Sequence, residues 1–83
     1  NGITPNGDNN NESWILDGID SLTNSVSIFN RWGDLVWHGD NYDNVNIVWS
    51  GKNSKGVELP PATYFYIIYA KGGPYNGWVE LTR

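Results

Sequence analysis

One stretch decides the fold of this 83-residue chain: Val26-Ser27-Ile28-Phe29-Asn30-Arg31-Trp32-Gly33-Asp34-Leu35-Val36-Trp37. Each half is rich in β-branched and aromatic residues, and the centre is polar and carries a glycine. Two such runs around a short polar turn predict a β-hairpin. The turn places Arg31 beside Trp32, a pair that hairpin geometry by itself does not require.

Outside this hairpin, short β-prone runs alternate with turn-forming residues. We expect runs of this kind at 13–16, 25–30, 35–38, 46–49, 63–71 and 75–82. Pro60-Pro61 excludes a helix or a central strand at that point and marks a corner. No apolar pattern of helical period persists, so the predicted fold class is all-β, an antiparallel Ig-like β-sandwich of roughly 6–7 short strands.

The chain is expected to form a single domain over residues 1–83, with 1–12 as a polar, Asn- and Asp-rich loop leading into it. A core of this size is close to the lower limit of self-sufficiency, and without cysteine it must rely on aromatic packing. Apolar residues on the inward faces of the expected strands predict the core: Trp14, Leu16, Val26, Ile28, Val36, Val48, Leu59, Tyr64, Tyr66, Ile68, Val79 and Leu81.

Charge and hydropathy exclude two classes of partner. The net charge is −4, with only 5 Lys and Arg, so no basic face for nucleic acid or an anionic membrane can be assembled. No apolar run approaches the ~20 residues of a membrane span. We therefore expect no nucleic acid and no membrane insertion, and we expect the isolated domain to be a monomer.

The loop at 6–12 offers oxygen ligands at alternate positions: Asn6, Asp8, Asn10 and Glu12. A hard cation such as Ca²⁺ takes six to eight oxygens, and a short loop with ligands at every second residue can wrap it. The alternative is an Asn-rich loop whose side chains satisfy its own backbone in Asx-turns. A calcium site is a hypothesis here, and no other cofactor is expected.

Catalysis is not predicted. His38 is the single histidine. The sequence has no second His or Cys nearby for a zinc site, and no serine in a nucleophile-elbow motif for a catalytic triad. We interpret it as a solvated residue beside a turn. Asp17, Asp34, Asp40 and Asp43 fall in expected loops, where aspartate is ordinary turn chemistry.

The aromatic residues allow another interpretation, a platform for sugar rings formed by Trp37, Trp49, Tyr69, Tyr75 and Trp78. Aromatic-rich strands more commonly supply core and cross-strand pairs. Trp78 is the best surface candidate, because it alternates out of phase with Val79 and Leu81.

Four blocks follow one another along the chain: Thr4-Pro5-Asn6-Gly7-Asp8, Ile28-Phe29-Asn30-Arg31-Trp32-Gly33, Leu59-Pro60 through Thr63-Tyr64-Phe65-Tyr66, and Gly77-Trp78-Val79-Glu80-Leu81-Thr82-Arg83. In these blocks the chain resembles the gliding motility-associated C-terminal domain, also described as the type B C-terminal sorting domain of the type IX secretion system of Bacteroidetes. The Asn30–Gly33 block is the most specific of them.

This resemblance implies a non-enzymatic domain at the C-terminal end of a large surface or secreted protein, such as a gliding adhesin. It implies recognition by outer-membrane components of the type IX machinery and export through the periplasm and outer membrane to the cell surface or the medium. The alternative is a carbohydrate-binding or adhesive Ig-like module, with or without bound calcium.

If the domain is a sorting signal, we expect its recognition residues at the hairpin tip and in the last segment: Arg31, Trp32, Gly33, Gly77, Trp78, Glu80 and Arg83. The exposed edge of the sheet could also bind a strand of the partner. For Arg31 we favour a structural role, in which its guanidinium stacks on an aromatic ring or bonds loop carbonyls.

Overall fold

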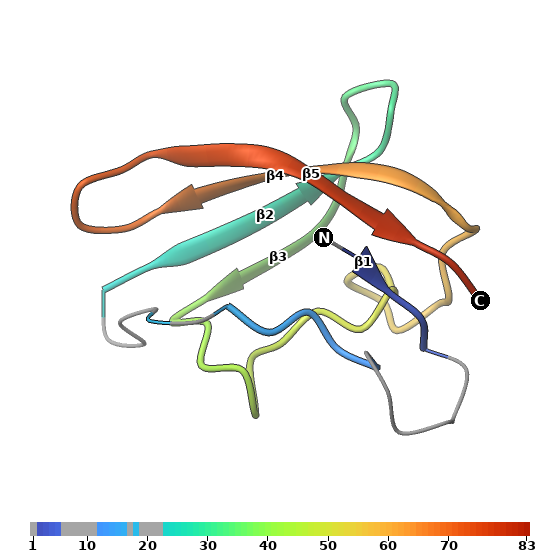
Figure 1. Cartoon of the computed structure of the whole chain (residues 1–83), viewed down its shortest axis with the longest axis horizontal. Coiled ribbons are helices and arrows are strands. Elements are labelled where there is room, and N and C mark those ends of the chain that lie inside the picture. The colour runs from blue at the N-terminus through green and yellow to red at the C-terminus, as the bar shows by residue number, and fades with distance from the viewer. Residues whose placement is uncertain (1, 6–11, 17, 19–22) are drawn as a thin grey trace.

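The computed structural model describes residues 2–5, 12–16, 18 and 23–83. It contains one five-stranded sheet in the order β1-β5-β4-β2-β3 (Figure 1). The strands are β1 (Gly2–Ile3), β2 (Ser25–Phe29), β3 (Leu35–Asp40), β4 (Ala62–Tyr69) and β5 (Tyr75–Leu81). No helix occurs among the described residues, so the all-β prediction is confirmed.

The sheet is mixed rather than wholly antiparallel. β2 pairs antiparallel with β3 and β4, and β4 pairs antiparallel with β5. β1 instead runs parallel to β5, and the amide of Thr82 extends this pairing with a 3.0 Å hydrogen bond to the carbonyl of Ile3. A parallel pair needs a long crossover. Here the chain between the two strands provides it, which local patterning does not reveal.

The second layer of the expected sandwich is not a sheet. Residues 12–16 and 41–61 lie on one side of the strands as irregular chain (Figure 1), so the runs at 13–16 and 46–49 are not strands. In this layer, side chains bond main-chain groups that a neighbouring strand would bond in a sheet. The Asn44 side chain accepts from the Leu16 amide at 2.7 Å and donates to the Leu16 carbonyl at 2.9 Å. Such side-chain bonds offer the backbone an alternative to sheet pairing. The part of the chain that the structure describes therefore has five strands, fewer than predicted.

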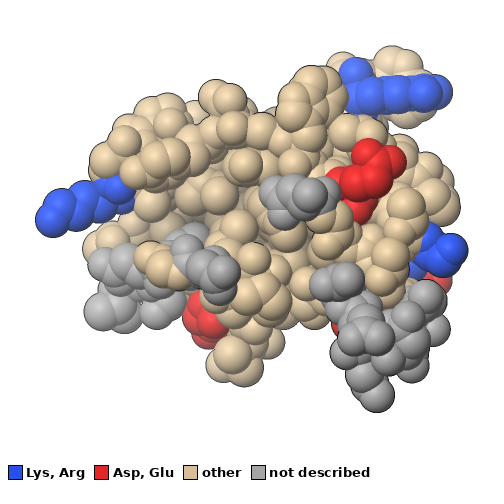
Figure 2. All heavy atoms as spheres, in the orientation of Figure 1, with Lys and Arg blue, Asp and Glu red and all other residues tan. Residues whose placement is uncertain are grey.

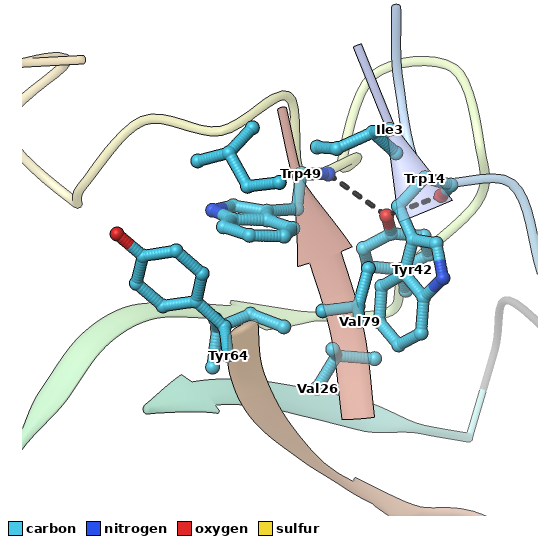
Figure 3. Packing of buried hydrophobic residues seen from close by; sticks show 9 residues of the cluster. Ile3, Trp14, Val26, Tyr42, Trp49, Tyr64 and Val79 are labelled. Carbon is cyan, nitrogen blue, oxygen red and sulfur yellow. Dashed lines mark hydrogen bonds between the residues drawn. The ribbon is translucent and has the colours of Figure 1, made fainter. Parts of the chain in front are cut away.

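The core lies between the sheet and this irregular layer (Figure 3). Every predicted core residue is buried or packs against the buried cluster. Three fully buried residues were not predicted: Ile3, Tyr42 and Trp49, with exposed fractions of 1%, 0% and 0%. All three lie in short or irregular segments, where no strand periodicity marks the inward face.

The hydroxyl of Tyr42 joins two parts of the irregular layer. It donates to the carbonyl of Trp14 at 2.6 Å and accepts from the amide of Trp49 at 2.8 Å (Figure 3). The Trp14 amide in turn donates to the Trp49 carbonyl at 2.9 Å. Burial raises the pKa of Tyr42 to about 12. A neutral phenol therefore holds this layer together at physiological pH.

A bulge in the β2–β3 hairpin sets which residues face outward. The pairing passes from Ile28↔Trp37 to Phe29↔Leu35, so Val36 is the extra residue. Val36 and Trp37 both pack against the core, and Leu35 stays 56% exposed on the opposite face, beside Phe29. Bulges redirect side chains in this manner.

Within the described ranges, the structure has no helix of the length and apolar character needed to cross a bilayer.

Candidate partner-recognition site

The hairpin turn is built by Asn30 and Gly33. The side-chain oxygen of Asn30 accepts from the amides of Trp32 (3.0 Å) and Asp34 (2.9 Å). The Gly33 amide donates to the Asn30 carbonyl at 3.0 Å, and Gly33 has a φ of 86°. Asparagine and glycine suit these positions because one bonds nearby amides and the other tolerates positive φ. Among the described residues, the hydrogen bonds of this turn use no side-chain atom of Arg31 or Trp32.

The same turn occurs a second time in the chain, at residues 53–57. The side-chain oxygen of Asn53 accepts from the amides of Lys55 (2.9 Å) and Val57 (3.0 Å). The Gly56 amide donates to the Asn53 carbonyl at 3.0 Å, and Gly56 has a φ of 82°. Its middle residues are Ser54 and Lys55. The turn geometry is therefore compatible with other residues in place of Arg31-Trp32.

Arg31 and Trp32 form the exposed tip of the hairpin. The guanidinium carbon lies 4.4 Å from the centroid of the Trp32 ring, and Trp32 is 72% exposed. The predicted stacking of Arg31 is thus present, on its own neighbour. In the described part of the chain, Arg31 makes no hydrogen bond to a loop carbonyl and no ion pair. The tip presents an indole and a cation to solvent.

The tip forms one wall of a surface groove of about 260 Å³. The opposite wall is the Pro60-Pro61 corner, which Tyr64 fixes by donating to the Pro60 carbonyl at 2.6 Å. Burial raises the pKa of Tyr64, so this donor stays protonated at neutral pH. The groove is lined by Asn30, Arg31, Trp32, Val36, Leu59, Pro60, Pro61, Ala62 and Tyr64. Two blocks that are far apart in sequence, 28–33 and 59–66, therefore meet at one apolar groove.

From the sequence we expect Arg31 to stabilise the fold by stacking on a ring or by bonding loop carbonyls, but in the structure it is Arg83 that bonds loop carbonyls. Its guanidinium donates to the carbonyl of Leu59 at 2.9 and 3.1 Å and to the carbonyl of Gly51 at 2.9 Å. It also lies 3.6 Å from a carboxylate oxygen of Glu58. These contacts tie the end of the chain to the irregular layer. Arg83 is therefore largely engaged within the domain.

Of the predicted residues of β5, Gly77 and Trp78 line the same hollow as Gly33 of the tip turn, whereas Glu80 does not. Trp78 is 58% exposed and packs on Phe65, with ring centroids 3.8 Å apart. Glu80 accepts a hydrogen bond from the hydroxyl of Thr63. A Cβ at Gly77 would lie 2.6 Å from the Tyr66 hydroxyl oxygen, so glycine at this position makes room for a ring. The structure therefore brings Gly33, Gly77 and Trp78 together, but it does not bring Glu80 and Arg83 into the same site.

Three of the four proposed calcium ligands, Asn6, Asp8 and Asn10, lie outside the described residues. Glu12 is described. Within the described ranges, no group of three or more His, Cys, Asp or Glu side chains could hold a metal ion. The calcium site stays a prediction.

His38 has partners that sequence spacing did not suggest. Its Nδ1 lies 2.8 Å from the Ser27 hydroxyl and its Nε2 lies 3.0 Å from Asp40. All three residues sit on the open face of the sheet, with the His38 and Asp40 side chains 41% and 73% exposed. A serine hydrolase needs a buried acid beside its histidine, whereas the Asp40 side chain is exposed. It also needs free backbone amides to bind an oxyanion, whereas amides inside a sheet are hydrogen-bonded to the neighbouring strands. We interpret this group as a surface hydrogen-bond network.

The five aromatic residues considered for a sugar platform do not share a surface. Trp49 is fully buried, and Trp37 packs against the core with its ring 5.8 Å from that of Tyr42. Tyr75 pairs with the inward-facing Ile68, whereas Trp78 faces outward with Phe65. Strand alternation therefore separates Tyr75 from Trp78, whereas Tyr69, in phase with Phe65, lies on the open face with Trp78.

Charged side chains are sparse on the face seen in Figure 2, where the basic ones stand apart from one another. That distribution agrees with the net charge of −4.

These features define the class of protein: a small all-β domain with an exposed Arg–Trp tip. The family model of the CHU_C type IX secretion signal domain matches residues 1–81, and the chain belongs to this family. No curated protein matches the chain. The domain is accordingly a sorting signal of the type IX secretion system. Membership implies interaction with that machinery, a surface or secreted destination and a non-catalytic role.

Proposed function

We propose that this domain is the C-terminal sorting signal of a large surface protein, and that outer-membrane components of the type IX machinery recognise its folded hairpin tip. The observation that carries this proposal is the pair of matched turns. Asn53–Gly56 forms the turn with Ser54-Lys55 in the middle, so Arg31-Trp32 is not needed for its geometry. A residue pair that the turn does not require, and that is exposed, is available for a partner.

The chemistry of the tip fits a binding hot spot. Trp and Arg are enriched among the residues that dominate protein interfaces. An indole that is 72% exposed leaves much apolar surface to bury. Arg31 adds a cation on a domain whose net charge is −4. The partner fitting this tip inserts an apolar side chain into the groove beside Trp32 and presents a carboxylate to Arg31.

The other predicted residues divide into two groups. Trp78 and Glu80 face outward from β5, and Trp78 is 58% exposed. Gly77 and Arg83 support the fold instead, through ring packing and carbonyl contacts. We propose that the parent protein travels through the periplasm and across the outer membrane, as do gliding adhesins of Bacteroidetes.

A reporter fusion tests the targeting role. Residues 1–83 are fused to the C-terminus of a periplasmic reporter in a type IX-competent bacterium. We expect the reporter to reach the cell surface or the medium, and to be retained in a strain that lacks the secretion pore. Retention in the competent strain, with the domain folded and protease-resistant, would contradict the proposal.

A further inference from the structure

An apolar row crosses the open face of the sheet, opposite the core. Phe65 pairs with Trp78 and with Phe29, and Phe29 pairs with Leu35. The row takes one residue from each of β5, β4, β2 and β3, so at ~4.8 Å per strand it is about 14 Å long. We call Phe29, Leu35, Phe65 and Trp78 the cross-strand row.

The neighbours of this row on the same face are polar except for Ile67. Thr63 and Glu80 lie on one side, and Asn76, Ile67 and the Ser27–His38 pair lie on the other. Solvent faces of antiparallel sheets are ordinarily polar, so a row of four apolar residues is unusual there. Phe29, Phe65 and Trp78 of the row border a hollow of about 480 Å³, which Gly33 and Ile67 also line. An exposed apolar strip with a polar rim is typical of an interaction surface.

The charges around the row favour a partner with a basic border over a second copy of this domain. β2 to β5 contain no Lys or Arg, and their outward-facing acids are Asp40 and Glu80. The basic residues Arg31 and Lys71 lie in the turns at the two ends of the sheet. A second copy of this domain would bring like charges together, whereas a surface with a basic border would complement them.

The area available also favours a second contact surface. A stable interface buries roughly 800 Å² on each partner. The Trp32 ring supplies at most ~250 Å² of this. Gly33 belongs to the tip turn and also lines the hollow beside the cross-strand row. One partner can therefore contact the tip and the row together.

We propose that the cross-strand row is a second docking surface for the type IX machinery, on which the partner seats an apolar stripe bordered by Lys or Arg. This inference rests on the proposed function, since it extends the surface that the machinery reads. It is independent of Arg31 and Trp32, because its residues come from the strands.

The test uses Leu35, which is 56% exposed at one end of the row. In the reporter fusion, Leu35→Lys should reduce export roughly tenfold or more, the effect of losing about 1.4 kcal/mol of binding. Leu35→Glu should reduce it less, because its charge suits a basic border. Val45 is the matched control, since it is apolar, 75% exposed and in the irregular layer. Val45→Lys and Val45→Glu should be exported normally, and all four variants should keep their melting temperature.

Export of both Leu35 variants at the wild-type level would overturn the docking surface and leave the tip proposal standing. A greater loss with Leu35→Glu would overturn the basic border. A domain dimer in sedimentation that Leu35→Lys dissociates would assign the row to a second copy and overturn the proposal. Glycan-array binding that Trp78→Ala abolishes would overturn it in favour of a sugar. If the wild-type fusion stays periplasmic, the proposed function fails, and this inference fails with it.

Discussion

Asn30 and Asn53 build the same turn in two places of one small domain. Each side-chain oxygen accepts from the amides two and four residues later, and each main-chain carbonyl accepts from the amide of a glycine three residues later. Comparing the two turns separates the Asn30–Gly33 block into parts. Asn30 and Gly33 make the turn, and Arg31 and Trp32 are displayed by it.

Alanine at the turn glycines should destabilise the domain by similar amounts. Gly33 and Gly56 have φ values of 86° and 82°, and no atom lies within 4 Å of an added Cβ at either position. The cost is therefore the left-handed backbone alone, about 1–2 kcal/mol for each substitution. Urea denaturation measures it, with Gly→Asn as the milder control. Clearly unequal costs would show that the two turns are not equivalent.

Tyr42→Phe should destabilise the domain at neutral pH although it keeps the ring. The change removes the acceptor for the buried Trp49 amide and the donor to the Trp14 carbonyl. An unsatisfied buried group costs on the order of 1–3 kcal/mol, so we expect a total loss of about 2–4 kcal/mol. Chemical denaturation at pH 7 checks this. Unchanged stability would mean that the irregular layer does not depend on the hydroxyl.

The same substitution should alter the response to alkaline pH. The pKa of Tyr42 is raised from 10.0 to about 12, so its contribution is fully present below pH 10 and is lost as pH rises towards the folded value. That difference corresponds to about 3 kcal/mol. We expect wild-type stability to fall more steeply than that of Tyr42→Phe above about pH 10. Parallel curves would contradict the assignment.

Asp43 should give the domain an acid-sensitive component of stability. Its carboxylate accepts from the amides of Ile47, Val45 and Asn46, and these bonds lower its pKa from 3.8. A depressed pKa stabilises the fold above the ordinary value, and this contribution is lost as pH falls through the folded value. Asp43→Asn should be less stable than wild type at neutral pH, and the gap should narrow below about pH 4. A constant gap in denaturation curves would refute this.

Arg83→Ala should reduce export and stability together. The guanidinium bonds the carbonyls of Gly51 and Leu59, and such charge-assisted contacts are worth about 1.5–3 kcal/mol when well placed. Melting temperature and export are measured on the same fusion, with Arg83→Lys as an intermediate case. Loss of export at full stability would make Arg83 a direct contact residue.

Local pattern predicted the strands well. The expected strands at 25–30, 35–38, 63–71 and 75–82 differ from β2 to β5 by at most two residues at each end, because alternation and turn residues act over a few positions. The β1–β5 pairing was not predictable in this way. It joins residues that are far apart in sequence and includes only Gly2–Ile3.

The conformation of the irregular layer could not be predicted from the sequence, for a different reason. It is held by single side chains, such as Asn44 to Leu16 and Tyr42 to Trp14, which have no periodic signature. Without such a signature, the sequence suggested that Trp49 could lie on the surface, whereas the structure buries it in the core.

At the candidate site, the sequence located the Arg31–Trp32 tip at a hairpin end. That the turn does not require Arg31 and Trp32 follows only from the structure, because the turn at Asn53 has the same hydrogen bonds with other residues in its middle.

The most direct measurement is the fraction of reporter exported by the double variant R31S/W32K, which gives the tip the residues of the chain's own second turn. Because Ser and Lys already occupy this geometry at 54 and 55, the variant should fold with a melting temperature close to that of the wild type. We predict that it is retained in the periplasm while the wild-type fusion is exported. Export of the folded double variant at the wild-type level would contradict recognition through the tip.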